Sequence, residues 1–189
     1  MIINDKALAR TLKRSGKTGF KICVNGYAAR VVSWDWAAKI PLSGANEPPK
    51  LTLAALVELL GYIPGDGECG HVYKTKSGWE WQSMTEAVFD IEYNQLARKE
   101  AGAIGCLPLP IGYGGPLILT TEQKMYRVTG PSSLVADRSR MCFKQPGSLC
   151  FGDYESELYI TCSRPDAPWG LWKQLENLDW EATENETEN

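Results

Sequence analysis

Cys69 and His71 stand two positions apart, and they form the one place where the sequence puts a thiol near an imidazole. An imidazole that takes the proton of a nearby thiol creates a nucleophile, provided that a third group orients the ring. His71 is the only histidine, however, and a lone histidine is more commonly structural. A Cys-dependent enzyme that uses Cys69 or Cys106 is therefore an alternative function, which thiol labelling at neutral pH would test.

Two other patterns resemble catalytic motifs without completing them. Glu86 and Asp90 are four positions apart on a predicted helix, a spacing that suits Mg²⁺ binding or acid–base work but is also common on a solvated face. The segment 15–18, Ser-Gly-Lys-Thr, is similar to the end of a phosphate-binding loop, but Thr11 stands where that loop requires glycine. We therefore assign no catalytic residue, no metal and no cofactor, and expect a protein that is not an enzyme.

The seven tryptophans are the most unusual feature of the composition. Trp34 and Trp36 flank Asp35, and a second pair flanks Glu80, so in a strand both members of a pair project from one side. Core packing is the commoner role, yet Trp, Tyr and Arg also anchor protein interfaces. The candidate partner-binding residues are Lys21, Tyr27, Arg30, Trp34, Trp36, Trp79 and Trp81.

These residues favour a non-catalytic protein-binding module as the first hypothesis. A small protein of this kind suits a viral accessory factor, from a phage or mobile element, that inhibits a host enzyme by covering its surface. A protein partner is thus expected, and the sequence gives no sign of a membrane partner.

The distribution of charge supports a second hypothesis, in which the partner is a nucleic acid. Residues 1–50 hold nine Lys or Arg against three Asp or Glu, whereas residues 173–189 hold one against six. Aromatic side chains beside Lys and Arg form platforms on which unpaired bases stack. The candidate nucleic-acid-binding residues are Lys6, Arg10, Lys13, Arg14 and Lys17.

Two N-terminal elements would position these residues. Asn4 can cap a helix that runs to about residue 15 and presents the cations to solvent. An Asn-Gly turn at 25–26 then joins strands 20–24 and 27–34 in a hairpin. That register places Lys21 directly opposite Arg30, and because like charges across a strand pair repel, either both side-chain tips extend into water or this face meets an anion.

The remaining pattern predicts a single α+β domain over residues 1–180. Helices are expected at 53–60, capped by Thr52, and at 85–101, opened by a capping box of Ser83 and Glu86, with a hairpin of 71–75 and 79–83 between them. The sequence after Trp36 has helical character. A Pro/Gly-rich stretch near 102–116 marks a sub-boundary and precedes a mainly antiparallel β half with short strands at 117–121, 125–129, 141–144, 149–151 and 158–162.

A C-terminal helix after Pro168 and an acidic polar tail over 181–189 complete the expected organisation. The longest apolar stretches have about ten residues, too few to span a bilayer, and the first residues contain no apolar signal region. We therefore expect a cytoplasmic protein whose six cysteines are buried and reduced.

Overall fold

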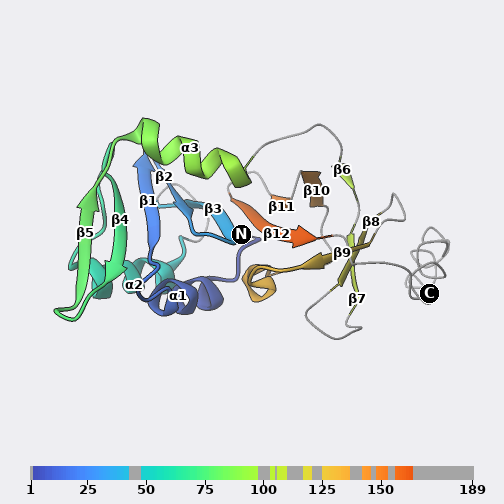
Figure 1. Cartoon of the computed structure of the whole chain (residues 1–189), viewed down its shortest axis with the longest axis horizontal. Coiled ribbons are helices and arrows are strands. Elements are labelled where there is room, and N and C mark those ends of the chain that lie inside the picture. Colours follow the sequence, from blue (N-terminus) through green and yellow to red (C-terminus); the bar gives the residue numbers. More distant parts are fainter. Residues whose placement is uncertain are drawn as a thin grey trace.

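The computed structural model describes residues 2–42, 48–97, 103–104, 106–109, 117–120, 125–136, 142–145, 148–152 and 156–163. Within these residues, three α-helices cover the two faces of an antiparallel sheet (Figure 1). The predicted α+β class is confirmed. The predicted C-terminal helix and the acidic tail lie outside the described residues.

One sheet joins the two halves of the chain. Its strands are β1 Phe20–Asn25, β2 Ala28–Val32, β3 Trp36–Pro41, β4 Cys69–Lys74, β5 Trp79–Ser83, β6 Ala103–Ile104, β7 Cys106–Leu109, β8 Leu117–Thr120, β9 Met125–Val128, β10 Cys142–Gln145, β11 Ser148–Gly152 and β12 Glu157–Ser163. The order is β5-β4-β1-β2-β3-β12-β11-β10-β6, and the end of β12 also pairs with β9, which continues to β8 and β7. Because β12 pairs with β3 on one side and β11 on the other, the two halves form a single sheet.

Helix α1 (Asp5–Arg14) forms as predicted, with the side chain of Asn4 accepting the N–H of Ala7 at 3.1 Å. Helix α2 (Lys50–Leu60) begins earlier than predicted, and Thr52 is not its cap. The Asp5 carboxylate of α1 accepts the N–H of Leu51 at 2.9 Å and of Thr52 at 2.8 Å. Because the capping side chain belongs to another helix, the sequence around residue 50 carries no cap signal, and the predicted start of α2 was misplaced.

The first hairpin forms, but its register differs from the prediction. The turn residues are Gly26 and Tyr27, and Gly26 has a φ of 60°. The Asp66 side chain accepts the N–H of Gly26 at 2.7 Å, which fixes the glycine at the first central position. Lys21 consequently pairs with Val32, whereas Arg30 pairs with a cysteine, so the expectation that Lys21 lies directly opposite Arg30 is wrong.

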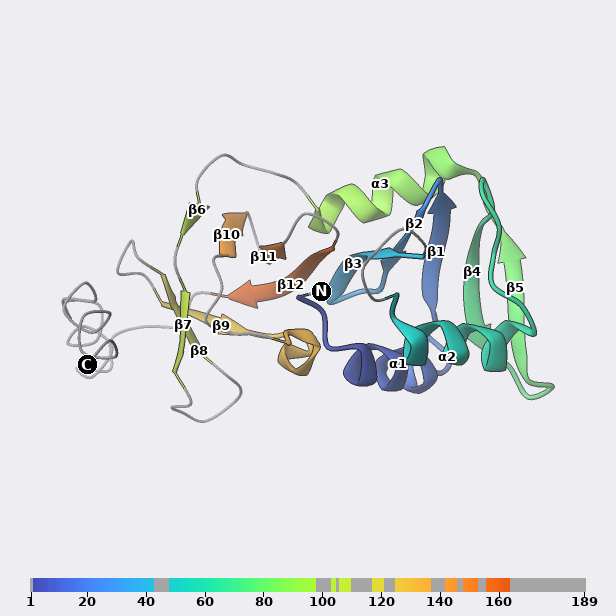
Figure 2. The same ribbon diagram turned by 180° about the vertical axis from the view of Figure 1, so that it is seen from behind.

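The two faces of the sheet have separate cores. On one face, the large core that contains Phe20, Ile22 and Trp36 also includes Leu8 of α1 and Leu56 of α2. On the other face lies α3 (Glu86–Leu96), whose buried side chains are those of Phe89 and Tyr93. Figure 2 shows α1 and α2 side by side on the face opposite α3.

Helix α3 begins one residue after Thr85, whose side chain accepts the N–H of Val88 at 3.4 Å. Thr85 is therefore the N-cap, and the predicted capping box of Ser83 and Glu86 is wrong. The predicted extension of this helix over 98–101 lies outside the described residues.

The second hairpin, β4–β5, forms as predicted, and the strands expected at 117–121, 125–129, 141–144, 149–151 and 158–162 correspond to β8 to β12. The sequence after Trp36 is not helical, because it forms β3 between β2 and β12.

None of the described helices is long and apolar enough to cross a membrane.

The described cysteines outside β7 and β10 are buried, as expected, but two of them are not reduced. Cys23 of β1 lies opposite Cys69 of β4, and the two form a disulfide. Cys150 and Cys162 are buried and have no disulfide. The expectation of reduced cysteines is therefore wrong for Cys23 and Cys69. The sequence shows each of them in a separate segment and does not reveal that the two strands pair.

Candidate binding site around Trp34

Arg30 is held between the sheet and helix α3. Its Nη1 donates to Asp90 Oδ1 at 2.6 Å and its Nη2 donates to Glu86 Oε1 at 2.7 Å. The guanidinium carbon also lies 5.3 Å from the ring centre of Phe89 and 5.6 Å from that of Tyr93. The Arg30 side chain is only 22% exposed, so it serves as a connection between the sheet and α3.

Lys21 on the same face forms an ion pair with Glu92 of α3. The anions that this face meets are thus carboxylates of the chain itself. Lys21 and Arg30, two of the predicted partner-binding residues, both form ion pairs with α3. The carboxylates of Glu86 and Asp90, which the sequence offered as an acid–base or Mg²⁺ pair, thus form ion pairs with Arg30. No cluster of three metal-ligating side chains occurs among the residues described.

Tyr93 of α3 faces the sheet next to Arg30, and its side chain is buried. Its hydroxyl has no hydrogen-bond partner in the part of the chain that the structure describes. Burial raises the pKa of Tyr93 above its usual range, the charge of Glu157 adds to this effect, and the charge of Arg30 opposes it. The neutral phenol therefore acts as a packing group of the α3 core.

Trp34 and Trp36 occupy opposite environments. The Trp36 side chain is 2% exposed and lies in the large core, whereas that of Trp34 is 76% exposed. The prediction that both project from one side of a strand is wrong, because β2 ends at Val32 and β3 begins at Trp36. Ser33 N donates to Trp36 O at 2.8 Å and closes the bend from which Trp34 projects.

Trp79 and Trp81 share one face of β5 and are half-buried against the large core. Trp81 covers Gly70, where a Cβ would lie 2.4 Å from the indole ring. Tyr27, at the tip of the first hairpin, is 78% exposed. Of the predicted partner-binding aromatic residues, Tyr27 and Trp34 are therefore the exposed ones.

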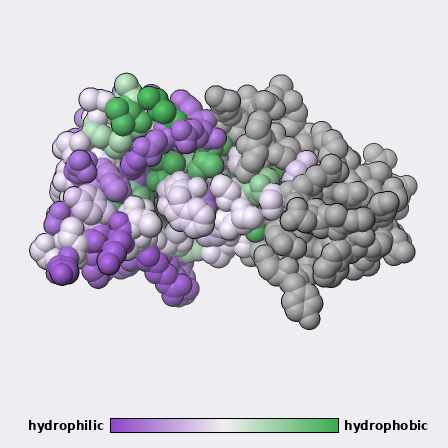
Figure 3. Space-filling model, viewed as in Figure 1, coloured by the Kyte–Doolittle hydropathy of each residue, from purple (hydrophilic) through white to green (hydrophobic). Residues whose placement is uncertain are grey.

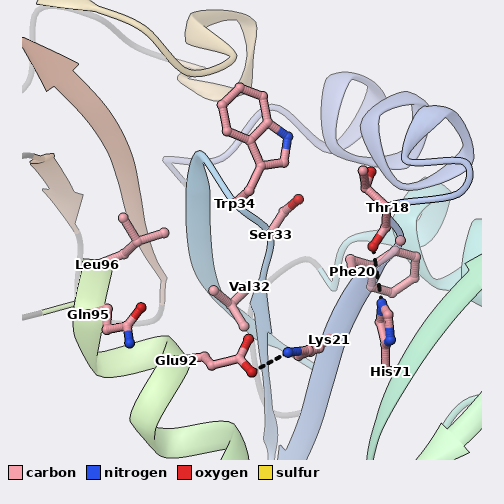
Figure 4. Close-up of a pocket in the computed structure, with 11 residues that line it drawn as sticks. Thr18, Phe20, Lys21, Val32, Ser33, Trp34, His71, Glu92, Gln95 and Leu96 are labelled. Carbon is pink, nitrogen blue, oxygen red and sulfur yellow. Dashed lines mark hydrogen bonds and ion pairs between the residues drawn. The ribbon is translucent and has the colours of Figure 1, made fainter.

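A hollow of about 330 Å³ lies on the α3 side of Trp34 (Figure 4). Lys21 and Glu92 pair across it, and His71 Nε2 lies 3.1 Å from the carbonyl oxygen of Thr18. The charges in this hollow are thus matched in pairs or held by backbone. Its lining residues are Thr18, Gly19, Phe20, Lys21, Val32, Ser33, Trp34, His71, Glu92, Gln95 and Leu96.

A second hollow of about 260 Å³ lies on the α1 side of Trp34 and is lined by Arg14, the last residue of α1. Asp35 also lines it, and partial burial raises the pKa of the Asp35 carboxyl while a hydrogen bond from its own backbone N–H opposes this. Trp34, Ser33 and Thr18 line both hollows, so these three residues lie between them.

The cations of α1 form an exposed row that leads to this second hollow. Lys6, Arg10 and Arg14 are spaced four residues apart, so they follow one side of the helix, and Lys17 follows in the next turn. No ion pair to these four occurs among the described residues, whereas Lys13 pairs with Glu58. In Figure 3, hydrophilic side chains project along the lower edge, where Figure 1 places α1.

Family models, curated proteins and solved structures were compared with this chain, and none matches it. Cys69, proposed as a nucleophile for the enzyme alternative, is bonded to Cys23, and the side chain of Cys106 lies outside the described residues. His71 contacts the Thr18 carbonyl and the Tyr73 ring, whose centre is 5.0 Å away.

The sequence alone singled out Trp34 and the α1 cations as candidates but not the polar residues that line the α3-side hollow with Trp34. Ser33, Thr18 and Gln95 come from three segments that the chain brings together only when it folds. No short motif links them, and pairing of β1 with β2 under α3 is the event that creates the hollow.

Proposed function

We propose that this chain is a non-catalytic protein that binds nucleic acid through α1 and Trp34. The observation that carries the proposal is that Arg14, the last member of the α1 row, lines the same hollow as the exposed indole of Trp34. A nucleic acid offers a phosphate and the flat face of a base. A cation beside an exposed aromatic ring can bind both, the cation the phosphate and the ring the base.

The charges of the row support a polyanion as the ligand. Lys6, Arg10, Arg14 and Lys17 face solvent without carboxylate partners among the described residues, so their charges are available to phosphates. Binding of phosphates by such cations releases condensed counterions and makes the affinity fall steeply with salt. Lys21 and Arg30 on the α3 face offer no such surface, because carboxylates of α3 already match their charges.

A protein partner is the second candidate function, in keeping with an accessory factor that inhibits an enzyme by covering its surface. The exposure of Tyr27 and Trp34 favours it, since aromatic side chains of this kind anchor protein interfaces. We rank it second because the other aromatic candidates are buried or half-buried and the cationic ones are paired.

The experiment is a titration of the full chain against fluorescently labelled oligonucleotides over a series of salt concentrations. We expect binding at low salt, with log Kd rising linearly with log salt by about 0.7 for each phosphate engaged on a single strand. Arg10→Ala with Arg14→Ala is expected to weaken binding about fivefold or more and to reduce the slope by about 1.4.

The matched control is Lys74→Ala with Lys76→Ala, which removes two exposed cations from the β4–β5 hairpin. This control is expected to leave the affinity and the slope unchanged. Absence of binding at low salt, or equal losses in the two double variants, would contradict the proposal. Saturable, salt-insensitive capture of a purified protein that is lost in Trp34→Ala would favour the second candidate.

A further inference from the structure

Trp34 is presented on a rigid base. Beyond the bond from Ser33 to Trp36, the backbone oxygen of Asp35 accepts both the N–H and the hydroxyl of Thr161 in β12, each at 3.0 Å. Gly130 packs so closely that a Cβ there would lie 2.4 Å from the same oxygen. The backbone of the bend is therefore fixed on both sides, and a ligand that stacks on Trp34 loses little affinity to ordering of the protein.

The two hollows beside this indole differ in chemistry. The α1 side contains Arg14, a cation without an ion-pair partner in the described part of the chain, and the carboxyl of Asp35, whose charged form is disfavoured by partial burial. The α3 side contains matched charges, Lys21 with Glu92, together with the uncharged side chains of Ser33 and Gln95. A phosphate is thus favoured on the first side, and a neutral, polar, flat group is favoured on the second.

Together, the two hollows suit one nucleotide whose base is unpaired. We propose, on the basis of the nucleic-acid function above, that the α3-side hollow holds one unpaired base of a single-stranded nucleic acid, stacked on Trp34, while Arg14 binds an adjacent phosphate. Ser33, next to Trp34, and Gln95, on α3 at the far side of the hollow in Figure 4, supply hydrogen-bonding groups for the base edge.

A nucleic-acid duplex cannot occupy both hollows while its bases stay paired. Its bases are paired and stacked, and to enter the α3-side hollow one of them must first leave the helix, which costs the energy of unstacking and unpairing. The α1 row alone would still attract the phosphates of a duplex. The inference therefore predicts a preference for single strands that the proposed function by itself does not require.

The test compares four ligands of equal length at one salt concentration by fluorescence anisotropy. They are a single DNA strand, a single RNA strand, a DNA duplex and an abasic strand that keeps its sugars and phosphates. We expect at least one of the two single strands to bind about 5- to 150-fold more tightly than the duplex and the abasic strand, the range given by stacking of one base on an aromatic ring. The DNA and RNA arms show which sugar the site accepts.

Trp34→Ala is expected to reduce single-strand binding to the abasic level and leave abasic binding unchanged, whereas Trp34→Phe keeps most of the preference. Tyr27→Ala is the matched control, because Tyr27 is an equally exposed aromatic residue away from the hollows. Circular dichroism of each variant verifies folding. Equal binding of the single strands, the duplex and the abasic strand would overturn this inference and leave the proposed function standing. No binding of any strand would overturn both.

Discussion

The α1 surface and the α3 face carry the same kinds of cation and use them differently. On the α3 face, Lys21 and Arg30 meet carboxylates of α3, so their charges hold a helix on the sheet. On the α1 surface, Lys6, Arg10 and Arg14 have no such partners among the described residues. A basic side chain indicates a ligand only where the fold leaves its charge unmatched.

Trp34, in the bend between β2 and β3, and Trp36, the first residue of β3, show the same difference for aromatic residues. Trp36 contributes to the core, and Trp34, two positions earlier, stands in solvent between two hollows. From the sequence, Trp34 and Trp36 were equally good candidates for a core position and for a surface position. The bend between β2 and β3 is what separates them.

The largest expected effect concerns stability on the α3 face. Arg30→Ala removes two charge-assisted hydrogen bonds and leaves Glu86 and Asp90 to repel each other, so we expect the free energy of unfolding to fall by about 1–3 kcal/mol. Urea denaturation followed by circular dichroism measures this change.

The matched variant on the other surface is Arg14→Ala, for which we expect a change in the free energy of unfolding of less than about 0.5 kcal/mol. Arg30→Ala should in turn leave the affinity for nucleic acid unchanged once the protein is folded. A large loss of stability in Arg14→Ala, or none in Arg30→Ala, would remove the distinction between the two surfaces.

A smaller effect concerns pH at the α1 side of Trp34. Because burial raises the pKa of Asp35, the folded protein holds this proton more firmly than the unfolded chain does, and stability gains from Asp35 appear as the pH falls through the raised value. Protonation also removes a negative charge from the Arg14 hollow, so the affinity for nucleic acid should rise over the same pH range.

Asp35→Asn mimics the protonated carboxyl at neutral pH. We expect this variant to bind nucleic acid up to about fivefold more tightly than the unmodified chain at pH 7, and to lose the rise in affinity at acidic pH. The measurement is a set of anisotropy titrations from pH 4 to 8 at constant ionic strength. An unchanged pH profile in Asp35→Asn would show that this carboxylate does not face the ligand.

Sequence patterns predicted the elements better than their edges. Hydrophobic periodicity and turn residues gave α1, both hairpins and the strands of the second half, because these signals are local. The cap of α2 and the register of the first hairpin were misplaced, since Asp5 and Asp66 act across the fold on distant backbone groups. The cap of α3 was misplaced by two residues, because Thr85 rather than Ser83 accepts an N–H of the first turn of the helix.

The candidate site was predictable only in part. The cations of α1 are local in sequence, and their exposure follows from the apolar stripe of Leu8 and Leu12 on the opposite side. The pairing of Arg30 with α3 was not predictable, because 56 and 60 positions separate Arg30 from Glu86 and Asp90. The hollows beside Trp34 likewise depend on tertiary packing.

Photo-crosslinking tests the central claim most directly, because it reports which side chain touches the ligand. A single strand that carries 5-iodouracil is irradiated with the full chain, and crosslinked tryptic peptides are identified by mass spectrometry. The account predicts a crosslink to Trp34 in the peptide 31–39, which disappears in Trp34→Ala. Crosslinks confined to Tyr27 in the peptide 22–30, or to the tryptophans of β5, would contradict it.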